Sequence, residues 1–134
     1  MATITSTPAE SHEHRLTQAA ADVLAERERQ VAVKGWTPEH DDWHKCGELA
    51  IAAACYAAHA GARVVIEAYD LTGTGTGMVE TKKWVSSAQE FVGRMWPWAR
   101  KWWKPRSTRR NLVRAAALLL AEIERLDRAS ARSA

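Results

Sequence analysis

Carboxylates and imidazoles gather in one short stretch of the sequence, KGWTPEHDDWHKCGELA, residues 34–50. In a helix, His40, His44 and Glu48 would lie four residues apart on one face, a spacing that can present metal ligands. Carboxylate oxygens suit Mg²⁺, whereas imidazole nitrogens suit Zn²⁺. The stretch predicts a Mg²⁺ site, with zinc as the alternative metal, and its expected metal ligands are Asp41, Asp42 and Glu48.

The same stretch could also activate water. A carboxylate or an imidazole close to a bound metal can act as a general base, so the candidate catalytic residues are Asp42, His44 and Glu48. A structural interpretation stays open beside this one: Asp41 or Asp42 caps the following helix and favours its dipole, while the histidines are solvated neighbours.

A second stretch, WPWARKWWKPRSTRRN at residues 96–111, interleaves four tryptophans with six basic side chains. Indole faces can stack on nucleobases, and guanidinium groups can grip phosphate oxygens through two hydrogen bonds. Arginines in the first turn of a helix oppose its dipole unless a negative group lies near them. These features predict a pocket for a small nucleotide, and its candidate residues are Trp36, Trp98, Trp102, Lys104, Arg109, Arg110, Asn111 and Arg114.

The tryptophans have a structural alternative, a cluster that closes one end of the fold and leaves a solvated basic rim. Polymeric nucleic acid is disfavoured because a single basic patch on a chain of net charge +3 supplies little electrostatic attraction elsewhere. The nucleotide interpretation requires the acidic stretch and the tryptophan stretch to face each other across one cleft.

Helical periodicity accounts for the elements that must position these residues. Apolar positions predict helices over about 16–34, 42–69 and 84–95, with Thr37 and Pro38 as a helix start. The last helix follows Ser107 or Thr108, and its apolar residues step by four, three, four and three, as in a helix packed within a bundle. Those residues are Leu112, Ala116, Leu119, Ile123 and Leu126.

The sequence therefore predicts an all-α fold: an antiparallel bundle of about four helices, with a flexible Gly/Thr loop and a Trp-rich basic loop before the last helix. Residues 1–14 are polar and read as a disordered arm, and residues 15–130 as a single helical domain. We expect no apolar run to reach the length of a membrane span, and therefore a cytoplasmic protein without a membrane partner. The Ala-rich second helix and the small size favour a homo-oligomer.

Two segments carry a resemblance to known proteins, VLAERERQVAVKGWTPEHDD…GELAIAAACYA and RRNLVRAAALLLAEIERLDR. They resemble a group of small helical proteins common in bacteriophages and prophages, most of them without an assigned function, over about 80 of the 134 residues. The ERERQ…KGW opening and the final AEIERLDR are also similar to all-α NTP pyrophosphohydrolases of the MazG-like class.

The MazG-like resemblance implies an oligomeric helical protein that binds a nucleoside triphosphate with Mg²⁺, held by a Glu-x-x-Glu pair and a Glu-x-x-Asp pair. Glu48 matches the first carboxylate, but Ile51 stands where the second belongs. Asn111 and Arg114 occupy the places of the other pair. A leaving pyrophosphate needs metal charge to stabilise its transition state, and these departures remove metal ligands.

Whether the protein is an enzyme therefore stays open. One function is a phage-type NTP pyrophosphohydrolase with an altered metal set. The other is a non-catalytic protein that sequesters a host nucleotide signal, an anti-defence role in the host bacterial cytoplasm. A structural or partner-binding helical module is the third alternative.

Overall fold

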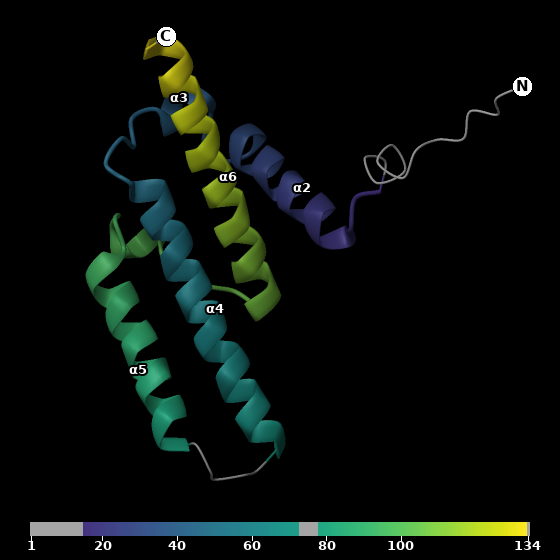
Figure 1. The fold of residues 1–134 in the computed structure, drawn as a ribbon, viewed down its shortest axis with the longest axis vertical. Helices are drawn as coiled ribbons and strands as arrows, with labels where there is room; N and C mark the ends of the chain where they lie inside the picture. The colour runs from purple at the N-terminus through teal and green to yellow at the C-terminus, as the bar shows by residue number, and fades with distance from the viewer. Residues whose placement is uncertain (1–14, 73–77, 134) are drawn as a thin grey trace, which may run out of the picture.

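The computed structural model describes residues 15–72 and 78–133, with side chains over 15–67 and 83–133 (Figure 1). The predicted arm at 1–14 and the Gly/Thr connector at 73–77 lie outside the described residues. Within those residues every regular element is helical and none is a strand, which confirms the all-α prediction. The elements are α2 (Gln18–Ala32), α3 (Pro38–Asp41), α4 (Glu48–Thr72), α5 (Met78–Met95), the 3₁₀ turn η1 (Arg100–Trp102) and α6 (Thr108–Ser133).

Hydroxyl side chains cap three of the helix starts: Thr17 caps α2, and Thr37 and Ser107 cap α3 and α6 as the sequence predicts. The Thr37 hydroxyl accepts a hydrogen bond from the His40 backbone N–H at 3.2 Å, and Pro38 occupies the first turn. The Ser107 hydroxyl accepts from the Arg110 N–H at 3.2 Å. Each hydroxyl satisfies a backbone donor that has no partner within the helix.

The helix predicted over 42–69 corresponds to α4, but its predicted start was wrong, because α4 begins at Glu48 and the short α3 before it already ends at Asp41. The chain turns between them, and Gly47 has φ of 85°, a conformation that glycine adopts readily because it has no Cβ. Residues 42–47 are consequently not helical, and α4 begins at Glu48. His40, His44 and Glu48 therefore do not share one helical face.

The four long helices lie side by side in the order α2, α6, α4, α5 (Figure 1). α4 packs on both α6 and α5, while α2 packs across the other side of α6. Small residues let α4 and α6 approach closely, and the core between them consists of Leu49, Ala52, Ala53, Tyr56, Ala115, Leu118 and Ala121. Because the helices form a row, α6 keeps one face that no helix of the described chain covers.

The predicted packed seam of the last helix lies on that uncovered face. We call Leu112, Ala116, Leu119, Ile123 and Leu126 the α6 stripe. Its large members are exposed: Leu112 by 45%, Leu119 by 46%, Ile123 by 54% and Leu126 by 52%. The prediction that this stripe packs inside the chain was wrong, because the opposite side of α6 faces α4 and α2. That side carries Asn111, Val113, Ala115, Ala117, Leu118, Ala121 and Glu122.

One stretch of α4, Glu48–Glu67, is long and apolar enough by composition to cross a membrane. The expectation that no run reaches this length was therefore wrong for α4. In the described fold one third of this stretch is buried, and it packs against α5 and α6.

Candidate functional site

Four residues, Asp41, Asp42, His44 and Glu48, define the acidic corner, which extends from the last residue of α3 to the first residue of α4. Asp41 is 1% exposed, and its carboxylate accepts a hydrogen bond from the guanidinium of Arg27 at 2.7 Å. The same guanidinium contacts Glu124 of α6 at 3.0 Å. Asp41 is therefore half of a buried ion pair that connects α3 to α2, and its charge is compensated without a metal ion.

Asp42 is compensated by the C-terminal part of α6. Its carboxylate lies 2.9 Å from Arg128 and 3.3 Å from Arg132, and Arg128 also donates to the Pro38 carbonyl oxygen at 3.2 Å. The hydrogen bond from Arg128 holds the pKa of Asp42 below its ordinary value, and the charge of Arg132 contributes further. These contacts attach α3 to the end of α6.

His44 and Glu48 pair with each other and not with the aspartates. His44 Nδ1 lies 3.2 Å from a Glu48 carboxylate oxygen, and the other oxygen of Glu48 accepts from the Cys46 backbone N–H at 2.6 Å. Burial raises the pKa of Glu48, but backbone hydrogen bonds from Glu48 and Cys46 outweigh it and leave the pKa below its ordinary value. The imidazole of His44 meets Trp98 edge to face, with ring centres 5.3 Å apart.

These contacts give the acidic corner little that fits a metal ion. Across the described residues no three His, Cys, Asp or Glu side chains come together as a ligand set. Asp41 and Asp42 point to different arginines, and Glu48 is engaged by a backbone donor. The Mg²⁺ site stays a prediction. The described side chains do not bring the carboxylates of the acidic corner together as one cluster.

A second region combines aromatic and basic side chains around a cavity of about 350 Å³, which we call the aromatic-basic pocket. It lies between the end of α2, the middle of α4 and α6, and the loop that follows α5. Its lining residues are Glu26, Arg29, Lys34, Trp36, Tyr56, Trp96, Trp102, Lys104, Arg106, Arg114 and Leu118. Four aromatic rings and five basic groups thus surround one space.

Interlocked rings hold the loop before α6 against the core. Trp103 packs on Tyr56 with ring centres 4.7 Å apart and on Trp96 at 4.9 Å, and Trp96 meets Trp98 edge to face at 5.4 Å. Aromatic pairs in these geometries add to the stabilisation from burial. Trp98 belongs to this packing and does not line the pocket, whereas Trp102 is 56% exposed at the pocket's edge.

Asn111 of α6 holds the loop that precedes this helix through two hydrogen bonds. Its side chain is fully buried, accepts a hydrogen bond from the Arg106 backbone N–H at 2.8 Å and donates to the Arg106 carbonyl oxygen at 3.0 Å. The amide thereby satisfies both backbone groups of one loop residue. Asn111 was a candidate nucleotide ligand, but the structure places its amide beneath the loop and outside the pocket lining.

Arg114 of α6 lines the pocket beside Lys104 and Tyr56. Its guanidinium donates to the Lys104 carbonyl oxygen and lies over the Tyr56 ring, 5.8 Å from the ring centre. Burial lowers the pKa of Arg114, and Arg110 and Arg29 nearby lower it further, although Tyr56 and Glu26 oppose them. An anion in the pocket would favour the charged form of Arg114.

The arginines that open α6 have acidic partners on α2. Arg109 lies 2.8 Å from Asp22, and Arg110 lies 2.7 Å from the buried Glu26, which Arg29 also contacts at 2.8 Å. Carboxylates of the chain itself thus supply the negative charge near this arginine-rich first turn, so these arginines no longer point to a phosphate ligand. Neither Arg109 nor Arg110 lines the pocket.

Four of the candidate ligands therefore meet in one pocket, Trp36, Trp102, Lys104 and Arg114, while Trp98, Arg109, Arg110 and Asn111 do not line it. Sequence reasoning did not select Arg29, Lys34, Tyr56, Trp96 and Arg106. The sequence did offer a signal for Lys34, because it stands two residues before Trp36 with only Gly35 between them. In the structure Gly35 has φ of 74°, and the turn there brings this segment back against α2.

The acidic corner and the aromatic-basic pocket do not share a cleft. No residue of the acidic corner lines the pocket, so the predicted common cleft was wrong for the described residues. Arg27 connects the two regions, since it contacts Asp41 and also donates to the Trp36 carbonyl oxygen at 3.4 Å. This connection is structural, and it brings no side chain of the acidic corner into the pocket.

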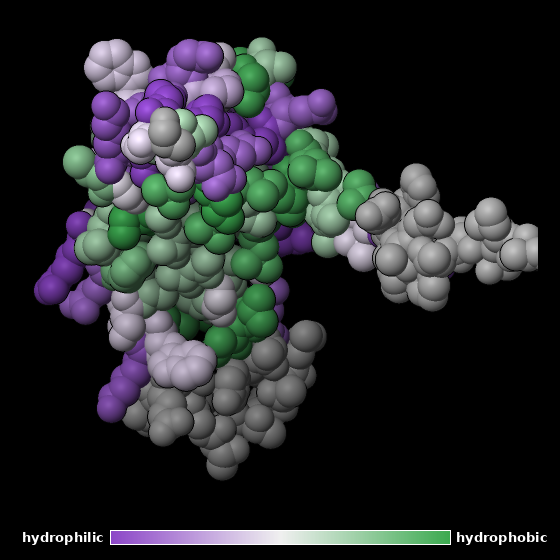
Figure 2. Space-filling view, turned by 45° about the horizontal axis from the view of Figure 1, so that its top comes forward, coloured by the Kyte–Doolittle hydropathy of each residue, from purple (hydrophilic) through white to green (hydrophobic). Residues whose placement is uncertain are grey.

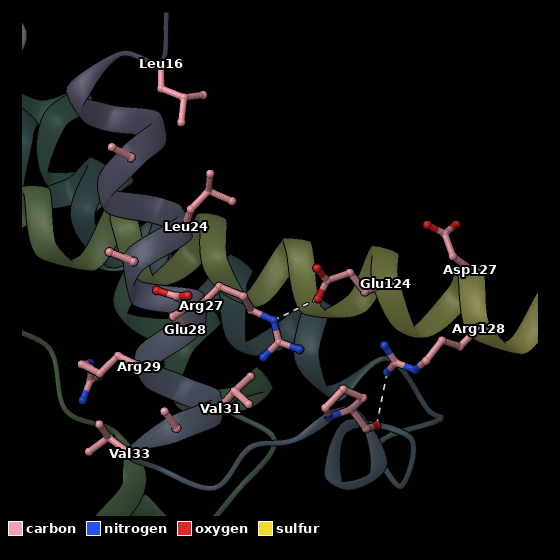
Figure 3. Close-up of a pocket in the computed structure, with 14 residues that line it drawn as sticks. Leu16, Leu24, Arg27, Glu28, Arg29, Val31, Val33, Glu124, Asp127 and Arg128 are labelled. Carbon is pink, nitrogen blue, oxygen red and sulfur yellow. Dashed lines mark hydrogen bonds and ion pairs between the residues drawn. The ribbon is translucent and has the colours of Figure 1, made fainter. Parts of the chain in front are cut away.

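A larger hollow of about 1410 Å³ runs between α2 and α6, and we call it the α2–α6 groove (Figure 3). Leu16, Leu24, Val31 and Val33 stand along its α2 side, and Glu124, Asp127 and Arg128 along its α6 side (Figure 3). Its surface is mostly apolar, and it lies apart from the aromatic-basic pocket.

No protein-family model, no curated protein and no solved structure matches this chain.

Proposed function

We propose that this protein binds a small phosphorylated nucleotide in the aromatic-basic pocket. The observation that carries the proposal is the surplus of cations beside aromatic rings in one pocket. Within the described side chains, Lys34, Lys104 and Arg106 line the pocket and form no ion pair. A cavity of about 350 Å³ lies within the range of small-molecule sites.

The two parts of a nucleotide correspond to the two kinds of lining residue. Trp36 and Trp102 offer indole surfaces against which a base can stack. Lys104, Arg106 and Arg114 offer donors and positive charge to phosphate oxygens. Charge also supports an anion, because burial lowers the pKa of Arg114 and a bound anion would stabilise its charged form.

The pocket is better suited to holding a nucleotide than to cleaving it. Among its described lining residues Glu26 is the sole carboxylate, and that group is engaged by Arg29 and Arg110. A general base needs a free lone pair within reach of water, and Glu26 offers little of this. We therefore favour sequestration of a nucleotide over its hydrolysis.

The experiment incubates the purified protein with a panel of NTPs, dNTPs and cyclic nucleotides in the presence of Mg²⁺. Chromatography then identifies the free nucleotides in solution before the protein is heat-denatured and again afterwards. We expect intact nucleotide to be released only after denaturation. Monophosphate and pyrophosphate in the first sample would establish hydrolysis instead, and recovery of free ligand without denaturation throughout the panel would reject the nucleotide proposal.

A matched pair of variants locates the binding. The double variant Lys104→Ala, Arg106→Ala removes two pocket cations, and Arg63→Ala removes one exposed cation of α4 that pairs with Glu67 at 3.7 Å. Titration calorimetry should show at least a tenfold loss of affinity for the double variant and none for Arg63→Ala. Equal effects would place binding elsewhere.

A further inference from the structure

The exposed α6 stripe is the most pronounced feature that the proposed function leaves unused. α6 has two apolar faces: one packs on α4 and α2, and the other carries the stripe. A helix that is apolar on both sides is normally covered on both sides. In the described chain nothing covers the second face.

The exposed apolar surface continues beside the stripe. Leu16, Leu24 and Val33 of the N-terminal part of the fold are exposed by 63%, 48% and 72% and stand along the α2–α6 groove (Figure 3). Asp127, on the α6 side of that groove, is the neighbour of Leu126 in the stripe. Figure 2 shows apolar residues as a broad band across the face in view. Large apolar patches exposed on a protein surface are typical of interfaces.

We propose that the α6 stripe pairs with the α6 stripe of a second copy of this chain in a two-fold antiparallel dimer. Stripe residues spaced four and three apart fit the knobs-into-holes packing of paired helices. In the antiparallel register that places Leu112 opposite Ile123 of the second copy, Ala116 lies opposite Leu119. Large residues then meet small ones in the middle layers, and the two-fold axis repeats each contact.

Charge selects the antiparallel direction. α6 begins with Arg109 and Arg110, whereas Asp127 lies near its other end and forms no ion pair among the described side chains. In the proposed register, Asp127 of each copy lies beside Arg109 of the other, whose guanidinium also pairs with Asp22 of its own chain at 2.8 Å. A parallel pair would place Arg109 beside Arg109 and Asp127 beside Asp127, which is unfavourable, as are parallel helix dipoles.

The extent of the surface also fits a second copy. From Leu112 to Leu126 the stripe runs along roughly 20 Å of helix. Standard interfaces cover about 800 Å² of each partner, an area that one helix stripe with the flanking groove can approach. Because Arg114 and Leu118 line the pocket from the far side of α6, pairing through the stripe leaves the aromatic-basic pocket open.

Sedimentation velocity of the full chain over a wide concentration range tests the proposal. We expect a species of twice 14.9 kDa that dissociates on dilution. Leu119→Glu places two charges at the centre of the interface and should weaken association about 100-fold or more. Val64→Glu, at an exposed apolar position of α4, is the matched control and should not weaken it.

Circular dichroism of Leu119→Glu should show unchanged helicity, because the replaced side chain is exposed in the single chain. A wild-type protein that stays monomeric at every concentration overturns the proposal. So does a dimer that Leu119→Glu leaves intact. Nucleotide binding has no part in these outcomes, so either proposal can fail alone.

Disulfide trapping tests the direction in a Cys46→Ser background, which removes the exposed native thiol. Leu112→Cys alone should give no crosslinked dimer, since the two positions lie more than ten residues apart along the antiparallel pair. An equimolar mixture of Leu112→Cys and Ile123→Cys should crosslink. Efficient crosslinking of Leu112→Cys with itself would indicate a parallel pair and overturn the proposed arrangement.

Discussion

The acidic corner and the aromatic-basic pocket differ in whether their charges have partners. In the acidic corner, Asp41 meets Arg27 and Asp42 meets Arg128, so each aspartate is compensated by an arginine distant in sequence. In the pocket, Lys104 and Arg106 face a cavity without a described acidic partner. A high density of charged residues in the sequence therefore does not by itself identify a binding site, and the proposal for the pocket depends on cations that have no acidic partner among the described residues.

The largest effect should come from breaking the ion pair that makes the acidic corner structural. Asp41→Ala leaves the Arg27 guanidinium buried with only Glu124 as a charged partner. Removing one partner of a buried pair costs about 3–5 kcal/mol of unfolding free energy. Urea denaturation of this variant, followed by circular dichroism, measures the loss.

The control for Asp41→Ala is Asp42→Ala, whose partners Arg128 and Arg132 are more exposed and can be solvated when the carboxylate is lost. It should destabilise clearly less. If Asp41→Ala left the unfolding free energy unchanged but abolished nucleotide binding, the acidic corner would be functional and the comparison would fail.

In the pocket, the next largest effect is expected for Arg114→Ala. Hydrogen bonds to charged groups contribute about 1.5–3 kcal/mol, so affinity for the bound nucleotide should fall roughly 10- to 100-fold. Titration calorimetry measures this affinity, and Arg63→Ala, which removes an exposed arginine paired with Glu67 on α4, should bind as the wild type does. Unchanged affinity for Arg114→Ala would show that Arg114 does not contact the bound nucleotide.

A smaller loss is expected for Trp102→Ala. Stacking of a base on an aromatic ring contributes about 1–3 kcal/mol, and the partial exposure of Trp102 favours the lower end, about a fivefold loss of affinity. Trp43→Ala is the control, because Trp43 is 82% exposed beside the acidic corner. Equal affinities for the two variants would show that Trp102 does not stack on the ligand.

The smallest expected effect is the pH dependence of the acidic corner. Because the folded protein holds the pKa of Asp42 below 3.8, the stabilisation from Asp42 is fully present above that pH and is lost as the pH falls through the folded-state pKa. The difference in melting temperature between wild type and Asp42→Asn should therefore shrink as the buffer is taken from about pH 6 to about pH 3. A difference that grows on acidification would contradict the assigned sign.

Local sequence patterns predicted the helices well because hydrophobic period, caps and breakers act within a few residues. Thr37, Pro38 and Ser107 mark helix starts, and Trp96-Pro97 follows the end of α5 at Met95. The start of α4 was predicted six residues too early, because Gly47, in a backbone conformation that glycine favours, directly precedes the helix.

The site was harder to predict because its charges are sorted by contacts between distant segments. Arg128 is 86 residues from Asp42, and Arg110 meets Glu26 only once α2 has packed on α6. No spacing rule relates such residues. The α6 stripe has the same difficulty: its period identifies an apolar face, but it does not tell whether the same chain or another molecule covers that face.

The hydrogen bonds between Asn111 and the backbone of Arg106 have a thermodynamic consequence. They order the segment that carries Trp102 and Lys104 when the protein folds, before any ligand arrives. A preorganised segment loses little conformational entropy on association, so more of the contact energy appears as affinity. An amide that touches no ligand can thus make binding tighter and keep the free and bound conformations alike.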